Sequence, residues 1–231
     1  MQRTICQLGF WAGMIAGTAT VAFVIVQLLQ LARVLTFPLD EILIYGTSLA
    51  IVVPFLLMML ALHHQTSTDK KIWTHGALLF SIVYVVFVTA NYIVQLATVV
   101  PMKLQGTVDQ VKLLVQTPHS MFWNFDAIGY IFMGLATLIA VPAFERTGFQ
   151  KWVRVSFIAN AFVTPLITFV YFYPVFSEKL LMMGFPWAVT APWFMFMLAI
   201  MFRKKWYAGR DEEEPVPKEK MKQFVKATQA V

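Results

Sequence analysis

Polar and aromatic side chains interrupt the long apolar stretches of this sequence, and they form its candidate binding site. A charged side chain inside an apolar run is costly in a bilayer, so Asp126 needs either a structural partner or a function. A carboxylate there balances a cation or accepts a hydrogen bond, while amides, phenols and an indole orient a small neutral or cationic amphiphile. The predicted ligand-binding residues are Asp126, Asn91, Gln95, Tyr130, Asn160, Tyr171 and Trp187.

Helical spacing groups these side chains into stripes. At about 100° per residue, Tyr84, Asn91 and Gln95 fall within roughly 40° of one another. Asn160 and Tyr171 share a face of a second helix by the same arithmetic. Stripes of Asn, Gln and Thr also join helices to one another in lipid, so interhelical hydrogen bonding is the alternative to ligand binding.

Three interpretations of Asp126 stay open. If Asn124 is the N-cap of a helix, Asp126 lies in the first turn, where the helix dipole favours a carboxylate. Asp126 otherwise forms a structural hydrogen bond with Asn91 or Gln95, or it binds a ligand or a proton.

Signatures of catalysis are scarce. The sequence has no Gly-rich phosphate loop, no HExxH motif and no paired carboxylates inside an apolar run. His63, His64 and His75 lie near two span ends, but adjacent histidines point in different directions on a helix, and a metal site wants three or four ligands. Cys6 is the only cysteine, which excludes an internal disulfide. We therefore predict no catalytic residue, no metal site and no cofactor.

Membrane-spanning helices are the elements that must position these residues. Of the 231 residues, 59% are hydrophobic and 13% are charged, whereas an average soluble domain has about 25% charged residues. A bilayer core about 30 Å thick needs roughly 20 apolar residues of helix. Six stretches have this length: residues 8–32, 42–62, 76–100, 121–144, 152–176 and 180–202. We predict an all-α, polytopic membrane helix bundle with six transmembrane helices.

The polar tail at residues 203–231 is too short for a second folded domain. Met221, Phe224 and Val225 recur at helical spacing, which predicts a short amphipathic surface helix. A solvated, partly disordered tail is the alternative.

Basic residues predict the orientation of the bundle. Six spans place both termini on one side, and fourteen Lys and Arg residues lie there, against four on the other side. Because positively charged loops stay in the cytoplasm, we predict that both termini are cytoplasmic. The net charge of +6 then reflects topology, so the predicted partner is the lipid bilayer and not nucleic acid. Asp126, Gln95 and Tyr171 fall in the outer half, which predicts an outward-opening pocket with Asp126 as its only fixed charge.

Small residues and an external loop complete the pattern. Gly9, Gly13 and Gly17 lie four residues apart in the first span, and small residues at this spacing let helices approach closely in lipid. They predict packing against another helix of the bundle or, alternatively, against another membrane protein.

Residues 101–120 form the longest external loop, whose apolar spacing predicts a surface helix that is either a connector or a lid.

A resemblance to a known family rests on the fourth span. Pro118-His119-Ser120-Met121-Phe122 precedes it, Asp126 stands a few positions ahead of Gly129-Tyr130, and Val-Pro-Ala closes it. This pattern, mainly over residues 118–142, resembles small six-span prokaryotic integral membrane proteins of unknown function. The resemblance implies a location in a prokaryotic inner membrane but no activity.

Three functions fit the sequence. The first is a non-enzymatic binding, transport-like or sensory bundle with an outward-facing polar and aromatic pocket for a small amphiphile. The second is an accessory or structural subunit of a membrane complex, bound through Gly9, Gly13 and Gly17. The third is a lipid-modifying membrane enzyme, which the lack of a nucleophile, base or metal set disfavours.

Overall fold

The computed structural model describes residues 2–213, and every regular element within them is a helix. Six helical segments are long and apolar enough to cross a membrane, which confirms the predicted all-α membrane bundle. The predicted amphipathic helix of the tail lies outside the described residues. The α-helices are α1 (Gln2–Leu31), α2 (Leu39–Gln65), α3 (Lys71–Val94), α4 (Val100–Leu104), α5 (Met121–Ala140), α6 (Gly148–Phe172), α7 (Glu178–Leu181) and α8 (Pro186–Glu213).

Shorter helical segments extend or join these helices. The segment η2 (Gln95–Val99) is a π-helix that continues α3 into α4. The other short segments are 3₁₀ helices: η1 (Thr68–Lys70), η3 (Val108–Leu114), η4 (Val141–Ala143) and η5 (Met182–Gly184).

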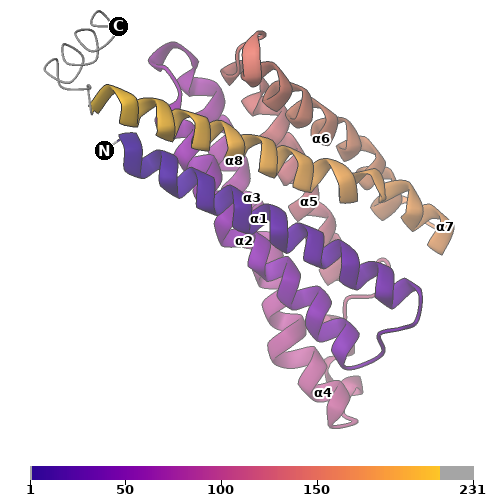
Figure 1. The fold of residues 1–231 in the computed structure, drawn as a ribbon. Coiled ribbons are helices and arrows are strands. Elements are labelled where there is room, and N and C mark those ends of the chain that lie inside the picture. The colour runs from indigo at the N-terminus through magenta and orange to yellow at the C-terminus, as the bar shows by residue number, and fades with distance from the viewer. Residues whose placement is uncertain (1, 214–231) are drawn as a thin grey trace, which may run out of the picture.

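The spanning helices form a closed ring in chain order (Figure 1). α1 packs on α2, α2 on α3, α3 on α5, α5 on α6 and α6 on α8, and α8 closes the ring against α1. Aromatic rings meet inside it: the ring centroid of Phe55 lies 5.1 Å from that of Tyr84 and 6.2 Å from that of Phe194. Phe157 lies 5.2 Å from Phe194. All four side chains are fully buried, so α2, α3, α6 and α8 share one core.

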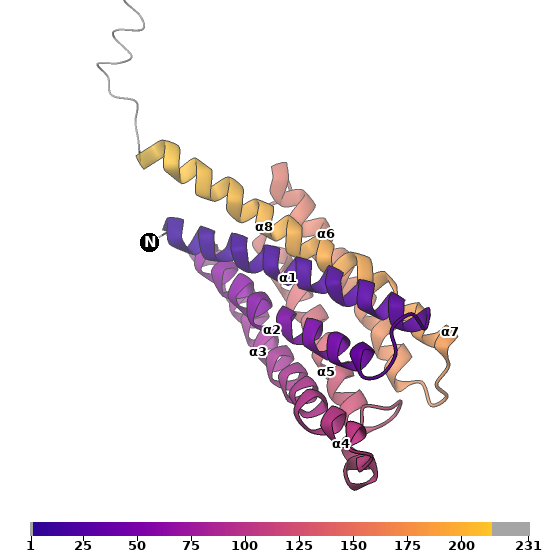
Figure 2. The same ribbon diagram turned by 60° about the horizontal axis from the view of Figure 1, so that its bottom comes forward.

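Polar contacts join different loops at each of the two ends of the helix bundle. At one end, Gln65 Nε2 donates to the carbonyl oxygen of Gln2 at 3.3 Å. At the other end, Lys103 forms an ion pair with Glu41 at 2.6 Å. The N-terminus and the far end of α8 both lie at the first end (Figures 1 and 2). An even number of spans requires this arrangement, while the cytoplasmic location of that end stays a prediction.

Glycines let α1 lie directly against α8. Gly9, Gly13 and Gly17 are all buried. A Cβ added to Gly13 would stand 2.9 Å from the Cβ of Ala199, and one added to Gly9 would stand 2.6 Å from the ring of Phe202. The bundle therefore uses this face internally, as the first of the two predictions states. A partner protein could reach it only if α8 moved away.

The loop between α3 and α5 departs from the predicted surface helix. α4 ends at Leu104, and Gly106 follows with φ at +71°, a left-handed conformation that commonly ends helices. The rest of the loop contains η3, a 3₁₀ segment interrupted at Val111 by non-helical dihedral angles. The apolar spacing thus reflects a folded loop that packs against η2, α4 and α5 at the end of the bundle opposite to the chain termini.

Large apolar side chains cover the outside of the ring. Trp11, Val86, Phe162 and Val189 are exposed along four different spans. In water such a surface would promote association, whereas hydrocarbon solvates it. The chain is therefore a multi-pass helical membrane protein whose outer surface contacts lipid.

Candidate functional site

A pocket of about 350 Å³ lies at the end of the ring opposite to the chain termini. All six spans contribute to its wall. Four predicted site residues line it together: Asp126, Tyr130, Tyr171 and Trp187. The further polar and aromatic lining residues are Phe23, Gln27, Gln30, Glu41, Tyr45, Tyr92, Gln116, Trp123 and Phe185.

Asp126 is the best-connected polar side chain of this pocket. Its Oδ1 accepts a hydrogen bond from the Tyr92 hydroxyl at 2.6 Å and a longer one from Asn91 Nδ2 at 3.4 Å. Its Oδ2 accepts a hydrogen bond from the Tyr171 hydroxyl. The side chain is only 4% exposed. Donors from α3 and α6 thus hold the carboxyl group of α5 at the centre of three helices.

Ser120, and not Asn124, caps the helix that carries Asp126. Ser120 Oγ accepts a hydrogen bond from the backbone N–H of Trp123 at 3.2 Å, and α5 begins at Met121. Asp126 is therefore the sixth helical residue, beyond the first turn, where the dipole effect fades. The capping interpretation of Asp126 is wrong, because the Ser side chain already provides the N-terminal acceptor.

Aromatic rings form the walls around the carboxyl group. The hydroxyls of Tyr92 and Tyr130 lie 3.2 Å apart, so Tyr130 joins the Asp126 network through Tyr92. The ring of Trp187 stands edge-on to that of Tyr130 at 4.8 Å. The indole of Trp123 lies 4.5 Å from the ring of Tyr171. Electron-rich faces next to a carboxylate are the environment that attracts organic cations.

Glu41 corrects the prediction that Asp126 is the only fixed charge. It lines the same pocket, because α2 begins at Leu39 and Glu41 falls in its first turn, at the end of the bundle opposite to the chain termini. Its Oε1 pairs with Lys103, whereas its buried Oε2 has no hydrogen-bond partner within residues 2–213. The pocket therefore contains two acids, one of which already has a cationic partner.

Asn91 and Gln95 connect the pocket to the loop between α4 and α5. Gln95 Nε2 donates to the carbonyl oxygen of Leu114 at 2.7 Å, and Gln95 Oε1 accepts from the backbone N–H of Gln116 at 3.1 Å. Asn91 Nδ2 donates to Gln116 Oε1 at 3.1 Å as well as to Asp126. Of the two amides proposed as partners of Asp126, only Asn91 reaches it. Gln95 instead fastens the loop, and neither amide lines the pocket itself.

Asn160 lies away from the pocket, although it shares a helix face with Tyr171. Its Nδ2 donates to Thr137 Oγ1 at 3.2 Å, and its Oδ1 accepts from Thr190 Oγ1 at 3.3 Å. Eleven residues of helix separate it from Tyr171, or about 16 Å at 1.5 Å per residue. Asn160 therefore joins α5, α6 and α8 at a deeper level and is not part of the candidate site.

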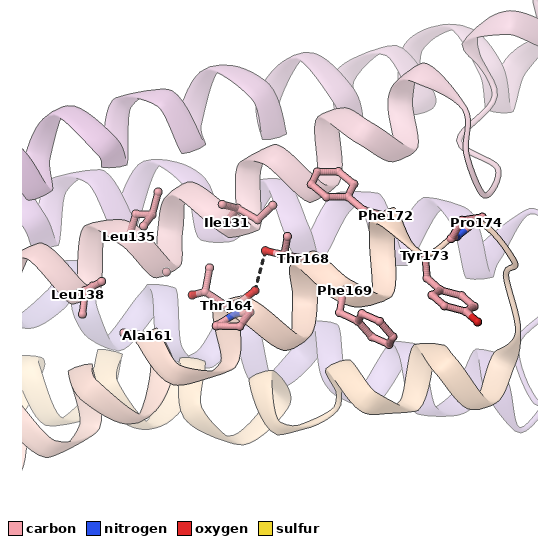
Figure 3. A pocket seen from close by; sticks show the side chains of 12 residues that line it. Ile131, Leu135, Leu138, Ala161, Thr164, Thr168, Phe169, Phe172, Tyr173 and Pro174 are labelled. Carbon is pink, nitrogen blue, oxygen red and sulfur yellow. Dashed lines mark hydrogen bonds between the residues drawn. The ribbon is translucent and has the colours of Figure 1, made fainter.

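A larger hollow of about 630 Å³ lies between α5 and α6 (Figure 3). Its lining is mostly apolar, with Ile131, Leu135 and Phe169 among the side chains drawn. The Thr168 hydroxyl donates to the Thr164 carbonyl oxygen at 2.9 Å, so it is already satisfied within α6. None of the described residues that line this groove carries a charge. We therefore place the candidate site in the smaller, polar pocket.

The histidines gather at the opposite end of the bundle. The ring centroid of His63 lies 5.9 Å from that of His64 and 5.5 Å from that of His75. Thr74 Oγ1 lies 3.1 Å from His63 Nδ1, which gives His63 a neutral hydrogen-bond partner. Within residues 2–213, no three His, Cys, Asp or Glu side chains are grouped so that they could hold a metal ion.

Several lining residues have no counterpart in the predicted set. Tyr92 donates directly to Asp126, yet in sequence it is only the neighbour of Asn91 and lies off the polar stripe. Gln116 and Glu41 belong to segments that hydropathy assigns to loops. Gln27 and Gln30 are polar residues near the end of an apolar run, and this was the available signal that α1 contributes to the pocket.

Comparisons of this chain with protein-family models, curated proteins and solved structures found no match.

Proposed function

We propose that this protein is a non-enzymatic binding, transport-like or sensory membrane bundle that takes a small cationic or neutral amphiphile in its outer pocket. One observation carries the proposal. Asp126 lies at the pocket wall with three protein donors but without a Lys or Arg ion-pair partner among the described residues. A carboxylate in this position favours a cation from outside the protein, because the hydrogen bonds stabilise its charge without neutralising it.

The aromatic side chains support the same ligand class. Tyr130, Trp123, Trp187 and Tyr171 place ring surfaces around the carboxyl group. Such rings attract organic ammonium groups and also pack against apolar chains. The volume of about 350 Å³ lies at the lower end of the range of about 300–1,000 Å³ for small-molecule sites. A compact headgroup therefore suits the pocket better than a large polar ligand.

The location belongs to the proposal as well. We place the protein in a prokaryotic inner membrane, with both termini in the cytoplasm and the pocket open to the outside. The support is the excess of Lys and Arg at the end that carries the termini, together with the resemblance over residues 118–142.

Replacement of Asp126 by Asn tests the proposal. The purified protein in a neutral detergent is heated with alkylammonium compounds and with neutral and anionic compounds of the same chain length. We expect the ammonium compounds to raise the unfolding temperature of the unchanged protein, because a ligand that binds only the folded state stabilises it. Asp126→Asn should abolish most of this rise.

Glu145→Gln is the matched control, since it also removes one negative charge but lies at the opposite end of the bundle, where Glu145 pairs with Lys70. It should retain the ligand-induced rise. The proposal fails if no ammonium compound stabilises the unchanged protein, or if Asp126→Asn responds as strongly as Glu145→Gln.

A further inference from the structure

The pocket has two chemically different ends. The carboxyl and hydroxyl groups of Asp126, Tyr92 and Tyr171 gather at one end. At the other end the lining is mostly apolar, with Gln27 and Gln30 as its polar members, and it comes from two segments, the last turns of α1 and the α7–η5 segment with the start of α8. The apolar lining residues of this end are Val24, Leu28, Leu31, Leu181, Met182, Phe185 and Ala188.

The apolar end of the pocket reaches the outer surface of the bundle. Leu28, Leu31, Met182 and Phe185 line the pocket and are also between 42% and 50% exposed, so the same side chains face both the pocket and the surroundings. The end of α1 and α7 lie side by side in both views of the ribbon (Figures 1 and 2). Both segments lie at the ends of spanning helices, and the ends of helices long enough to cross a bilayer reach the lipid headgroups and upper chains. We call this opening between Leu28, Leu31, Met182 and Phe185 the lateral portal.

We propose that the ligand is a long-chain quaternary ammonium amphiphile that enters from the outer leaflet through the lateral portal. Its headgroup lies beside Asp126, and its alkyl chain passes between α1 and α7 into the lipid. This inference rests on the proposed function and adds the headgroup, the chain and the route of entry.

The hydrogen bonds of Asp126 favour a headgroup without N–H donors. Its two oxygens already accept from Tyr92, Asn91 and Tyr171, so little acceptor capacity remains for an ammonium that must donate several hydrogen bonds. A quaternary ammonium needs only negative potential and ring surfaces, and Asp126 with the rings of Tyr130 and Trp187 provides both. Glu41 lines the same pocket, but its ion pair with Lys103 offsets its charge, so Asp126 is the acid left to attract the headgroup.

Gly184 offers a way to close the portal without altering the polar end. It lines the pocket as the last residue of η5, and a Cβ added there meets no atom within 4 Å. Gly184→Trp therefore introduces a large ring at the portal. Gly46→Trp is the matched control, because Gly46 also has open space around it, is exposed on α2 and does not line the pocket. Leu28→Trp, from the opposite wall, is a second portal variant if Gly184→Trp fails to fold.

The experiment measures equilibrium binding to the full-length protein in nanodiscs. The two probes are radiolabelled hexadecyltrimethylammonium and butyltrimethylammonium, and empty nanodiscs give the background. We expect Gly184→Trp to weaken hexadecyltrimethylammonium binding by at least roughly tenfold and to leave butyltrimethylammonium binding unchanged. Gly46→Trp should bind both probes like the unchanged protein.

Two outcomes overturn the inference while the proposed function survives. In one, the long-chain probe binds Gly184→Trp and the unchanged protein equally well. In the other, Gly184→Trp weakens both probes to the same extent, which would place the indole in the headgroup site and not in the route of the chain. If neither probe binds the unchanged protein and no other ammonium compound stabilises it, the proposed function fails and the inference fails with it.

Discussion

At the scale of single residues, the donors around Asp126 explain how an acid is tolerated in an apolar helix. An acid at the centre of a bilayer costs about 2.5–3.5 kcal/mol on insertion scales, and Asp126 costs less because it is only the sixth residue of α5. A hydrogen bond to a charged group returns about 1.5–3 kcal/mol. With Tyr92, Tyr171 and Asn91 as donors, the protein offsets this cost without a counter-ion from residues 2–213. The hydrogen bonds of the folded state therefore keep the carboxyl group in place.

Removal of one phenolic donor should show how much the hydrogen bonds to Asp126 stabilise the protein. Tyr171→Phe deletes the hydrogen bond to Asp126 Oδ2 while it keeps the ring that packs on Trp123. We expect a loss of about 1–3 kcal/mol in stability, because a buried acceptor loses its partner. Thermal unfolding in detergent measures the loss.

Tyr45→Phe serves as the comparison for Tyr171→Phe. Tyr45 lines the same pocket, and its ring lies 5.6 Å from that of Tyr92, but none of the hydrogen bonds to Asp126 comes from it. It should unfold close to the temperature of the unchanged protein. Equal losses in the two variants would contradict the role assigned to the Tyr171 hydroxyl.

Residue types and periodicity predict Asp126, Tyr130 and Tyr171 correctly as neighbours of one pocket. They do so because a buried charge limits where its helix can face. The same reasoning misplaces Asn160. Helical spacing tells which face of a helix a residue is on, but it does not tell which residues of that face lie at the level of the pocket. Tyr92 is missed for the opposite reason: its hydroxyl reaches Asp126 through the length of the side chain and the angle between α3 and α5, which single-helix spacing does not contain.

At the scale of elements, helix boundaries decide what reaches the pocket. Hydropathy predicts the second span at 42–62, whereas α2 begins at Leu39 and so includes Glu41. Apolar composition measures the stretch that hydrocarbon favours, but backbone hydrogen bonds extend a helix into the polar interface. The fifth span shows the reverse, because α6 ends at Phe172 and not at 176.

The contact between α1 and α8 should be sensitive to side-chain volume. Gly13→Leu places a branched side chain where a Cβ already stands 2.9 Å from Ala199 and 3.1 Å from the Met195 carbonyl oxygen. Overpacking of this kind costs about 1–3 kcal/mol or more. We expect a clearly lower unfolding temperature in detergent.

Gly46→Leu makes the same change in a spanning helix, at a site with open space around it. It should leave the unfolding temperature nearly unchanged or raise it slightly, since Gly is a weak helix former. A Gly13→Leu variant as stable as Gly46→Leu would mean that α1 and α8 do not pack as closely as the structure shows.

At the scale of the whole molecule, closure of the ring brings the first and last spans together. The number of spans follows from the length of each apolar run, and the pairing of neighbours in chain order follows from short loops. The α1–α8 pair joins segments that are far apart in the sequence, and only the glycine spacing hinted that α1 has a close neighbour. This closure matters for the pocket, because α1 and α8 form one side of it.

Impermeant thiol labelling tests the orientation of the molecule. In a Cys6→Ser background, which removes the only native cysteine, Gln105→Cys marks the external loop and Thr147→Cys marks the opposite end; both positions are exposed. We expect a membrane-impermeant maleimide added to intact cells to label Gln105→Cys and to label Thr147→Cys only after lysis. The reverse pattern would turn the pocket toward the cytoplasm.

The two hydrogen bonds of the Asn91 amide group connect the buried acid to the loop between α4 and α5. One nitrogen donates both to Asp126 and to Gln116, and its hydrogens are fixed in one plane at a fixed angle. A displacement of the carboxyl group therefore changes the bond that Asn91 offers to the loop. Under the proposed function, occupancy of the pocket should therefore alter the loop, and an environment-sensitive dye attached near residue 105 should report it without touching the ligand.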